Sequence, residues 1–341
     1  MIRVVVVDDS AYNRVSISKM LENHPEIKVI DTAATGEDAI HKIVRLKPDV
    51  VTLDLEMEPM DGFAVLRWLR LNFPIPVVIV SSKSSDKNIF KALEMGAVDF
   101  VAKPTGKASP ALQQMEGELI LKVLNASRAN VAKKEEPKEE PAPVYEPITK
   151  KNYEIILIGA STGGPPVLQK IFSSIPVLPV PVVVAQHMPP VFTTLFAERL
   201  SKISQMKFKE AEMKEELKAG FVYIAPGGKH SLLEKEGDKI YIKLISKREE
   251  ELYCPSVNIL FESAAKIYKE KIIAVLLTGM GDDGAEGLLK IKNEGGFTIA
   301  ESQETAIIFG MPGEAIRINA AERVLPSWQI PSFLIELLQK K

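Results

Sequence analysis

The chain of 341 residues contains only one cysteine, Cys254, which excludes an internal disulfide and any zinc site built from several thiolates. So few cysteines are typical of proteins in a reducing compartment. The first residues, MIRVVVVDDS, form an apolar run of strand length that ends at two aspartates, without the longer apolar region and cleavage site of a signal peptide. We therefore expect a cytoplasmic protein.

Long hydrophobic runs are also missing. The most apolar window, Ile175–Ala185, is shorter than the roughly 18–20 residues of a membrane-spanning helix, and prolines interrupt it at positions 176, 179 and 181. We expect a soluble protein without a membrane span, so that any contact with a membrane is peripheral.

Neither sign of charge is in clear excess. The 43 Lys and Arg residues face 45 Asp and Glu residues, which leaves a formal net charge of −2 and no general attraction to nucleic acid. Hydrophobic residues make up 46% and charged residues 26%, both ordinary values for a globular protein. Since domains cluster near about 100–150 residues, the length predicts two of them.

A charged, proline-rich segment separates the two halves. Its sequence, KKEEPKEEPAPVYEPITKK at Lys133–Lys151, holds five Lys, five Glu and four Pro and offers almost nothing to bury. The prolines disfavour a helix because each removes a backbone donor. We interpret residues 131–152 as an extended linker between a first domain, residues 1–130, and a second, residues 153–341.

Both halves alternate short apolar runs with amphipathic stretches, as expected for doubly wound parallel sheets. The first half has expected strands at Ile2–Val7, Val29–Ala33, Val50–Leu53, Val77–Val80 and Phe100–Ala102, with helices such as Asn13–Asn23 and Glu37–Lys47. The second half has expected strands at Ile155–Ile158, Val182–Ala185, Ile272–Leu277 and Thr298–Ala300, and helices at Val167–Ser174, Phe192–Ile203, Ser256–Tyr268 and Ala285–Asn293.

One stretch of the second half alternates apolar and polar residues instead. It runs over Val222–Ile245 around a Glu236-Gly237-Asp238 turn and predicts an antiparallel hairpin. The predicted fold class is therefore α/β, with two doubly wound parallel-sheet domains, the second carrying an added hairpin.

Carboxylates follow the expected strands of the first half. Asp8 and Asp9 come after the first apolar run and Asp54 after the third. Because ligands bind outside the carboxyl ends of parallel strands, we expect the three acids to meet at one sheet edge. Clustered carboxylates repel one another unless a cation lies among them, and Mg²⁺ prefers oxygen ligands. The pattern predicts Mg²⁺ here, although Asp8 or Asp9 alone could equally cap the following helix.

Two further polar residues follow later strands, Ser81 after the fourth and Lys103 after the fifth. A carboxylate in such surroundings can attack a phosphoryl donor, while an ammonium and a hydroxyl group hold the transferring phosphoryl oxygens. Helix capping would account for neither Asp54 nor Lys103.

With these residues the first half resembles a response-regulator receiver domain over about residues 2–124. The resemblance rests on Asp8 and Asp9, Asp54 in LDLEMEPMDG, Ser81 in VSS, and Lys103 before a proline. It implies that Asp54 is the phosphoacceptor and that Asp8, Asp9, Asp54 and the backbone carbonyl of Glu56 hold Mg²⁺. It also implies that Phe100 occupies the position of the switch aromatic residue.

In the second half, the strand Ile155–Ile158 runs into GASTGGPP and places Ser161 on a glycine-rich strand-to-helix turn. Small neighbours let a substrate carbonyl approach closely, and the N–H groups at a helix N-terminus favour developing negative charge. This suits an exposed nucleophile, yet such a turn could equally cradle a phosphate.

A serine nucleophile needs a base, and the chain has only four histidines. His187 ends the strand VVVAQH at the same expected sheet edge as Ser161, which makes it the best candidate. We expect His24 and His41 on solvated surfaces of the first half, and His230, in PGGKHS, in a loop beside the hairpin.

The histidine in turn needs an acid that fixes its tautomer. The loop TGMGDDGAEG offers Asp282 and Asp283, and composition does not choose between them. Its glycines leave backbone N–H groups free to stabilise an oxyanion. The order serine, histidine, aspartate differs from the order in α/β-hydrolases, so we do not expect that fold.

Together, GASTGG, QHMPP and TGMGDDG resemble the catalytic domain of the chemotaxis response-regulator protein-glutamate methylesterases, a likeness that runs from about Tyr153 to the C-terminus and includes IAPGGKH and FGMPGEAI. A receiver joined to this domain by a linker is that family's architecture. The resemblance implies a catalytic set of Ser161, His187 and Asp283. It also implies that the Met280 backbone N–H contributes to the oxyanion hole and that Thr162 lies beside the nucleophile.

The function implied by this resemblance is a phosphorylation-activated serine hydrolase. It would remove methyl groups from glutamyl esters of methyl-accepting chemoreceptors, releasing methanol, and would also deamidate receptor glutamines. A chemotaxis histidine kinase would be the phosphodonor, and Mg²⁺ would serve the receiver alone.

Two rival functions belong to other classes. A DNA-binding response regulator should carry a basic recognition helix, whereas the second half carries glycine-rich loops after its strands. A nucleotide-dependent oxidoreductase should carry G-x-G-x-x-G, whereas GASTGG reads G-x-x-x-G-G.

Overall fold

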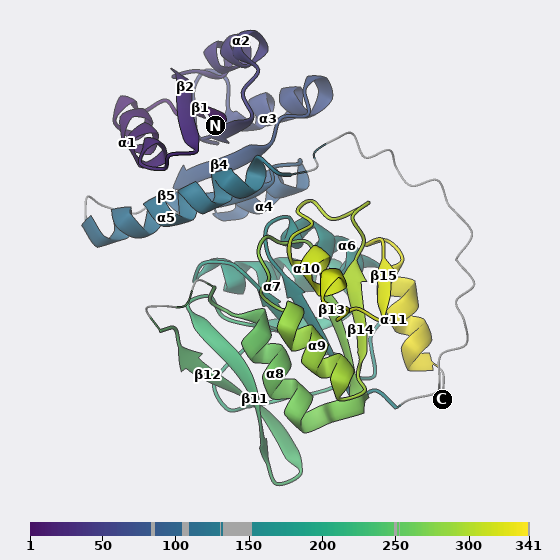
Figure 1. The fold of residues 1–341 in the computed structure, drawn as a ribbon. Helices are drawn as coiled ribbons and strands as arrows, with labels where there is room; N and C mark the ends of the chain where they lie inside the picture. Colours follow the sequence, from purple (N-terminus) through teal and green to yellow (C-terminus); the bar gives the residue numbers. More distant parts are fainter. Residues whose placement is uncertain are drawn as a thin grey trace. The chain divides into compact units, whose positions relative to one another are not determined.

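A computed structural model of the chain describes residues 1–82, 86–103, 109–129, 131, 152–248, 251 and 253–339. The chain divides into two compact units, Met1–Pro137 and Lys138–Lys341, each considered by itself (Figure 1). Nearly all of the expected linker, Lys133–Lys151 included, lies outside the described residues, as does residue 104, the proline after Lys103. No described helix is both long enough and apolar enough to cross a lipid bilayer.

The first unit is a parallel sheet flanked by helices. Its strands are β1 (Ile2–Val7), β2 (Ile27–Ala33), β3 (Val50–Leu53), β4 (Val77–Ser82) and β5 (Asp99–Lys103). Its helices are α1 (Ala11–Glu22), α2 (Gly36–Leu46), α3 (Gly62–Asn72), α4 (Asp86–Glu94) and α5 (Ser109–Ala126). The strand order is β2-β1-β3-β4-β5 and every neighbouring pair is parallel.

The second unit is built around a seven-stranded parallel sheet. Its strands are β6 (Ile155–Ala160), β7 (Val182–Gln186), β8 (Lys207–Glu210), β10 (Phe221–Ile224), β13 (Ile272–Leu276), β14 (Phe297–Glu301) and β15 (Arg323–Leu325). The helices are α6 (Gly164–Ser174), α7 (Phe192–Ile203), α8 (Val257–Tyr268), α9 (Ala285–Asn293), α10 (Met311–Arg317) and α11 (Ile330–Gln339), with a short 3₁₀ helix, η2 (Lys269–Lys271). The strand order is β15-β14-β13-β6-β7-β10-β8.

The strands form where the sequence supplies apolar runs that can be buried on both faces. All six residues of β6 and all five residues of β13 are buried, as expected for inner parallel strands covered by helices. Helices α8 and α9 lie side by side against the sheet, as Figure 1 shows, and α8 packs on both β6 and β13. The predicted fold class, with two parallel-sheet α/β domains, is confirmed.

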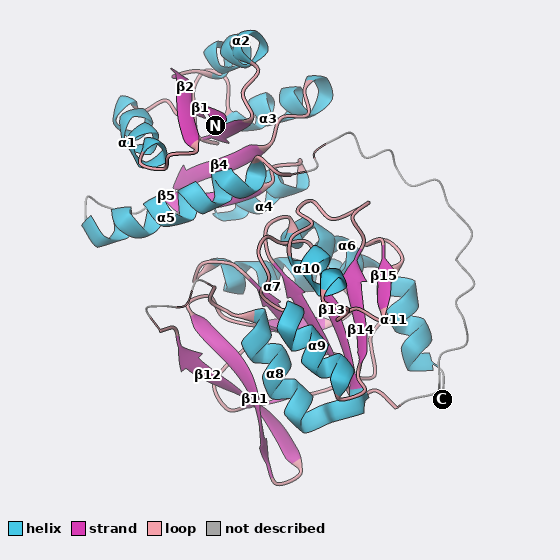
Figure 2. Ribbon diagram, viewed as in Figure 1, coloured by secondary structure: helices cyan, strands magenta, loops and turns pink. Residues whose placement is uncertain are grey.

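The expected hairpin needs one correction. Strands β11 (Lys229–Glu236) and β12 (Lys239–Ser246) are antiparallel and form a projecting ribbon in Figure 2. The two-residue strand β9 (Glu215–Glu216) pairs with β12 as the third strand of this small sheet. Residues 222–224, which we placed in the hairpin, belong instead to β10 and pair in parallel with β7 and β8. They are buried on both faces, and Pro226-Gly227-Gly228 ends their strand before β11 begins.

In both sheets, some later strands are added on one side of the first strand and others on its opposite side. The first strand of each unit, β1 or β6, has neighbours on both sides, reached by connections that run in opposite directions. Ligands of open α/β sheets bind outside the carboxyl ends of the strands at this switch point. The loops after β1 and β3, and those after β6 and β13, are therefore where function is expected.

Candidate functional site

Ser161 directly follows β6 at the switch point of the second unit. Its backbone N–H donates to the Thr278 carbonyl at 3.0 Å, and its own carbonyl accepts from Gly164 at 2.8 Å, at the start of α6. Gly163 has φ +78°, a conformation that favours glycine, and it lets the chain turn from strand into helix. The side chain of Ser161 thus faces the sheet edge at the N-terminus of a helix.

His187 follows β7 and brings the predicted serine and aspartate together. Its Nδ1 atom lies 3.0 Å from Ser161 Oγ, and its Nε2 atom lies 2.8 Å from Asp283 Oδ2. An ionised carboxylate can only accept, so the proton sits on Nε2 and Nδ1 is left to accept from the serine hydroxyl. Three side chains separated by up to 122 positions in the sequence therefore form one hydrogen-bonded line.

Asp283 is the carboxylate that reaches the histidine. It is 4% exposed, whereas its neighbour Asp282 is exposed to solvent. The Asp283 carboxylate also accepts from Ser256 Oγ (2.9 Å), Val257 N (2.7 Å) and Asn258 N (2.9 Å) at the N-terminus of α8. Burial alone would raise its pKa, but the His187 hydrogen bond and the two backbone N–H groups hold the pKa of Asp283 below its usual value.

The glycine-rich loop after β13 packs directly against the serine. A methyl group on Gly279 would lie 2.7 Å from Ser161 Cβ and 2.2 Å from Met311 Sδ, so only glycine fits. Among the described residues, the Met280 N–H is paired with no backbone oxygen. Thr162 is buried, and its carbonyl accepts from the Thr278 hydroxyl at 3.0 Å.

Several residues of this site were not found from the sequence. The Gln186 amide donates to the Ser161 carbonyl at 2.9 Å, and the Thr278 hydroxyl lies 3.0 Å from the Thr162 carbonyl and 3.2 Å from the Ile308 carbonyl. Ser256 holds Asp283, and the Tyr253 ring lies on the His187 ring. The signal available in the sequence was position: Gln186 is the last residue of β7 and directly precedes His187, and Thr278 begins the loop after β13 that carries Asp283.

The expected position of His230 was wrong. It lies in β11 rather than in a loop and is fully buried. Its Nδ1 accepts from the Ser256 N–H at 3.1 Å, and its Nε2 lies 2.8 Å from Glu251 Oε2. Because both nitrogens have partners, the ring can be buried without an unpaired polar atom, which the sequence alone did not reveal.

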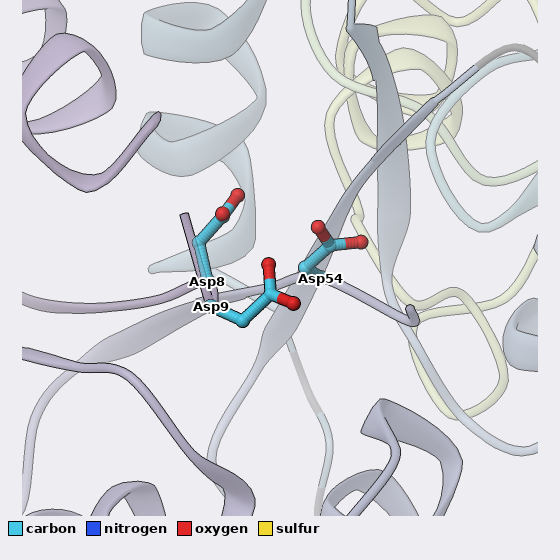
Figure 3. A group of neighbouring side chains, drawn as sticks. All are labelled: Asp8, Asp9 and Asp54. Atoms are coloured by element: carbon cyan, nitrogen blue, oxygen red, sulfur yellow. The ribbon is translucent and has the colours of Figure 1, made fainter. Parts of the chain in front are cut away.

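The first unit brings its three predicted acids together. Asp8 and Asp9 follow β1 and Asp54 follows β3, and each offers one carboxylate oxygen within 4.8 Å of the others (Figure 3). Asp8 and Asp54 are buried, at 0% and 5% exposure, while Asp9 is exposed. The three acids offer only oxygen ligands, which a hard cation such as Mg²⁺ prefers.

Lys103, at the end of β5, reaches the same group of acids. Its ammonium lies 2.7 Å from Asp8 Oδ2 and forms an ion pair and hydrogen bond with Asp54. Burial raises the pKa of Asp54 above its usual value, and the Lys103 charge offsets only part of that effect. A buried carboxylate beside a fixed positive charge results.

The other residues predicted for this site are Ser81, Glu56 and Phe100. Ser81 is fully buried at the end of β4, and no described residue hydrogen-bonds its hydroxyl. The Glu56 N–H donates to Asp54 Oδ1 at 3.2 Å, which places the Glu56 backbone next to that carboxylate. Phe100 is buried in β5, where the Lys122 ammonium lies 4.7 Å from the centre of its ring.

Comparison with known proteins identifies a family for each unit. The family model described as CheB methylesterase matches residues 156–334, which is more than half of the chain, and that of the response regulator receiver domain matches residues 4–114. The chain belongs to the CheB methylesterase family. The family predicted from the sequence motifs is thereby confirmed.

Relatives match over the whole chain. A protein-glutamate methylesterase/protein-glutamine glutaminase of Myxococcus xanthus is 41% identical over 341 residues, which cover 100% of this chain and 98% of that protein. One of Caldanaerobacter subterraneus is 44% identical and covers 98% of this chain and 96% of that protein. The crystal structure of the Thermotoga maritima CheB methylesterase catalytic domain is 47% identical, with a TM-score of 0.53, and covers 54% of this chain and 98% of that domain.

Proposed function

We propose that this protein hydrolyses γ-methyl esters of glutamyl residues on methyl-accepting chemoreceptors, releasing methanol. The observation that carries the proposal is the hydrogen-bonded line of Ser161, His187 and Asp283 in a chain of the CheB methylesterase family. Relatives that match nearly the whole of this chain are named protein-glutamate methylesterases, which supports this substrate class.

In this proposal each of the three side chains has its own role. As Ser161 Oγ attacks the ester carbonyl, its proton passes to His187 Nδ1, and Asp283 stabilises the imidazolium through Nε2. The proton then goes from Nδ1 to the methoxide, which leaves as methanol. Water attacks the acyl-enzyme with His187 again taking a proton, and glutamate and free Ser161 result. The Met280 N–H is the donor available for the oxyanion.

The same attack on a glutamine side chain would release ammonia and also leave glutamate. The names of the relatives include protein-glutamine glutaminase, which supports this second reaction. Both reactions share one acyl-enzyme, so they should be lost together when Ser161 is removed.

Phosphorylation of Asp54 is the proposed control of this activity, with a chemotaxis histidine kinase as the phosphodonor. Asp54 would accept the phosphoryl group, with Lys103 and the Ser81 hydroxyl as partners for its oxygens. Asp8, Asp9, Asp54 and the Glu56 carbonyl would hold Mg²⁺, which when bound neutralises charge on the phosphoryl group. Phe100 is the aromatic side chain whose position would respond, shifting the population of active molecules.

Methanol release from methylated receptor membranes tests both parts of the proposal. Wild type should release methanol, Ser161→Ala should release none, and a small phosphodonor should accelerate the wild type but leave Asp54→Ala at its basal rate. Equal release by wild type and Ser161→Ala would exclude the hydrolase. Equal acceleration of wild type and Asp54→Ala would exclude Asp54 as the control point.

A further inference from the structure

The imidazole of His187 is covered on one face by Tyr253. The two ring centroids lie 4.6 Å apart and the ring planes are inclined by only 10°. The contacts with Ser161 and Asp283 hold His187 by the two nitrogens at its edge. Both contacts lie in the ring plane and oppose a tilt of that plane only through the angle preference of a hydrogen bond, whereas a second ring stacked on the face blocks a tilt toward it directly.

Tyr253 also touches the loop that carries Met280 and Asp283. A methyl group placed on Gly281 would lie only 2.4 Å from the Tyr253 hydroxyl oxygen, so the phenol packs against the Gly281 backbone. Gly281 has φ +78°, which a larger residue adopts only with strain. The Tyr253 ring is thus in contact with both the base and the glycine-rich loop.

The segment that carries Tyr253 is anchored to buried residues. Three positions later, Ser256 donates its N–H to His230 Nδ1 (3.1 Å) and its hydroxyl to Asp283 Oδ1 (2.9 Å). Two positions earlier, Glu251 is bonded to His230 Nε2 at 2.8 Å. His230 is fully buried and therefore fixes both flanks of Tyr253.

We propose that Tyr253 is a positioning residue for the His187 imidazole, an inference that rests on the hydrolase function proposed above. Its ring holds the imidazole in the plane in which Nδ1 faces Ser161 Oγ. Its electron-rich face also favours the imidazolium that forms during proton transfer over the neutral ring. Both effects act in the transition state and not in substrate binding, so they belong to kcat rather than to KM.

The test compares Tyr253→Phe, which keeps the aromatic face, with Tyr253→Leu, which removes it, in the full chain. With methylated receptor membranes, Tyr253→Phe should stay within about twofold of wild type, while Tyr253→Leu should lose about tenfold in kcat with KM nearly unchanged. Tyr253→Met, which fills the space with a flexible chain, should behave like Tyr253→Leu. Tyr241→Leu is the matched control, because Tyr241 is a partly buried tyrosine on β12, and it should leave kcat unchanged.

Thermal denaturation of each variant identifies any change caused by unfolding, and the Phe and Met variants then carry the comparison. Wild-type kcat in folded Tyr253→Leu or Tyr253→Met would overturn the positioning role. So would an equal loss in Tyr253→Phe, because the ring face would then not be the active feature. Failure of the hydrolase proposal looks different, since wild type and Ser161→Ala would then release equal amounts of methanol.

Discussion

At the scale of single residues, the hydrogen-bond donors around Asp283 determine its charge state and the tautomer of His187. Asp283 accepts hydrogen bonds from His187, from the Ser256 hydroxyl and from two N–H groups of α8. These donors keep the carboxylate ionised in spite of its burial and leave only the Nε2–H tautomer of His187 compatible with it. Asp282, next to it in the chain, is exposed to solvent.

Asp283→Asn tests this tautomer argument. An asparagine amide can donate to Nε2, which places the imidazole proton on Nδ1, where it cannot accept from Ser161. We expect kcat for methanol release to fall by roughly 10⁴-fold with the fold intact. Asp282→Asn is the control and should retain wild-type kcat. A loss of less than tenfold in Asp283→Asn would mean that this carboxylate does not set the tautomer.

The low pKa of Asp283 also predicts a pH dependence of stability. A carboxylate whose folded-state pKa lies below the ordinary value of about 3.9 stabilises the fold at pH above that value, and the stabilisation is lost as the pH falls through the folded-state pKa. At pH 7 the urea concentration at the midpoint of unfolding should therefore be lower for Asp283→Asn than for its parent. The difference between the two midpoints should narrow toward about pH 3.

Fluorescence can assign this measurement to the second unit. The chain has two tryptophans, and a Trp68→Phe background leaves only Trp328. If the two urea midpoints differ by the same amount at pH 7 and at about pH 3, the predicted loss of stabilisation at low pH is contradicted.

At the scale of elements, the parallel strands were the most predictable part. The apolar runs at β1 and β3 match the expected bounds, as do helices α7 and α9. Strand β10 was misassigned because four residues of alternating size do not distinguish a hairpin strand from a buried parallel one. The Tyr253 stack and the burial of His230 depend on partners 66 and 26 positions away, so no local pattern could indicate them.

Glycine positions give an element-scale prediction. Gly279→Ala should abolish methanol release, because the new methyl group would displace Ser161 Cβ or the Met311 thioether. Gly117→Ala lies on the exposed face of α5, where the added methyl group would meet no other atom within 4 Å. It should instead stabilise the chain by about 0.5–1 kcal/mol. Wild-type turnover by Gly279→Ala would show that the loop does not need this close approach.

At the scale of the whole molecule, two units of the same fold class use the same position for different chemistry. Each places its polar residues after the first strand and after a neighbouring strand across the switch point. In the first unit these residues are carboxylates that suit a cation and a phosphoryl group. In the second unit they are Ser161 and, after β13, Asp283 and a glycine-rich loop.

Mg²⁺ should stabilise the first unit by binding to Asp8, Asp9 and Asp54. At a concentration a hundredfold above its dissociation constant, the ion should add about 2.7 kcal/mol, seen as a rise in the unfolding midpoint of the Trp68 signal in a Trp328→Phe background. Asp8→Asn should reduce this rise, and the exposed Glu22→Gln, at the end of α1, should not. An undiminished rise in Asp8→Asn would place the cation elsewhere.

The central claim is that Ser161 is a nucleophile activated by His187. The most direct test treats the full chain with a fluorophosphonate, which reacts with activated serines, and locates the adduct by mass spectrometry. The account predicts one adduct on the peptide that contains Ser161, formed much more slowly in His187→Ala. An adduct on another residue, or an equal rate in His187→Ala, would contradict it.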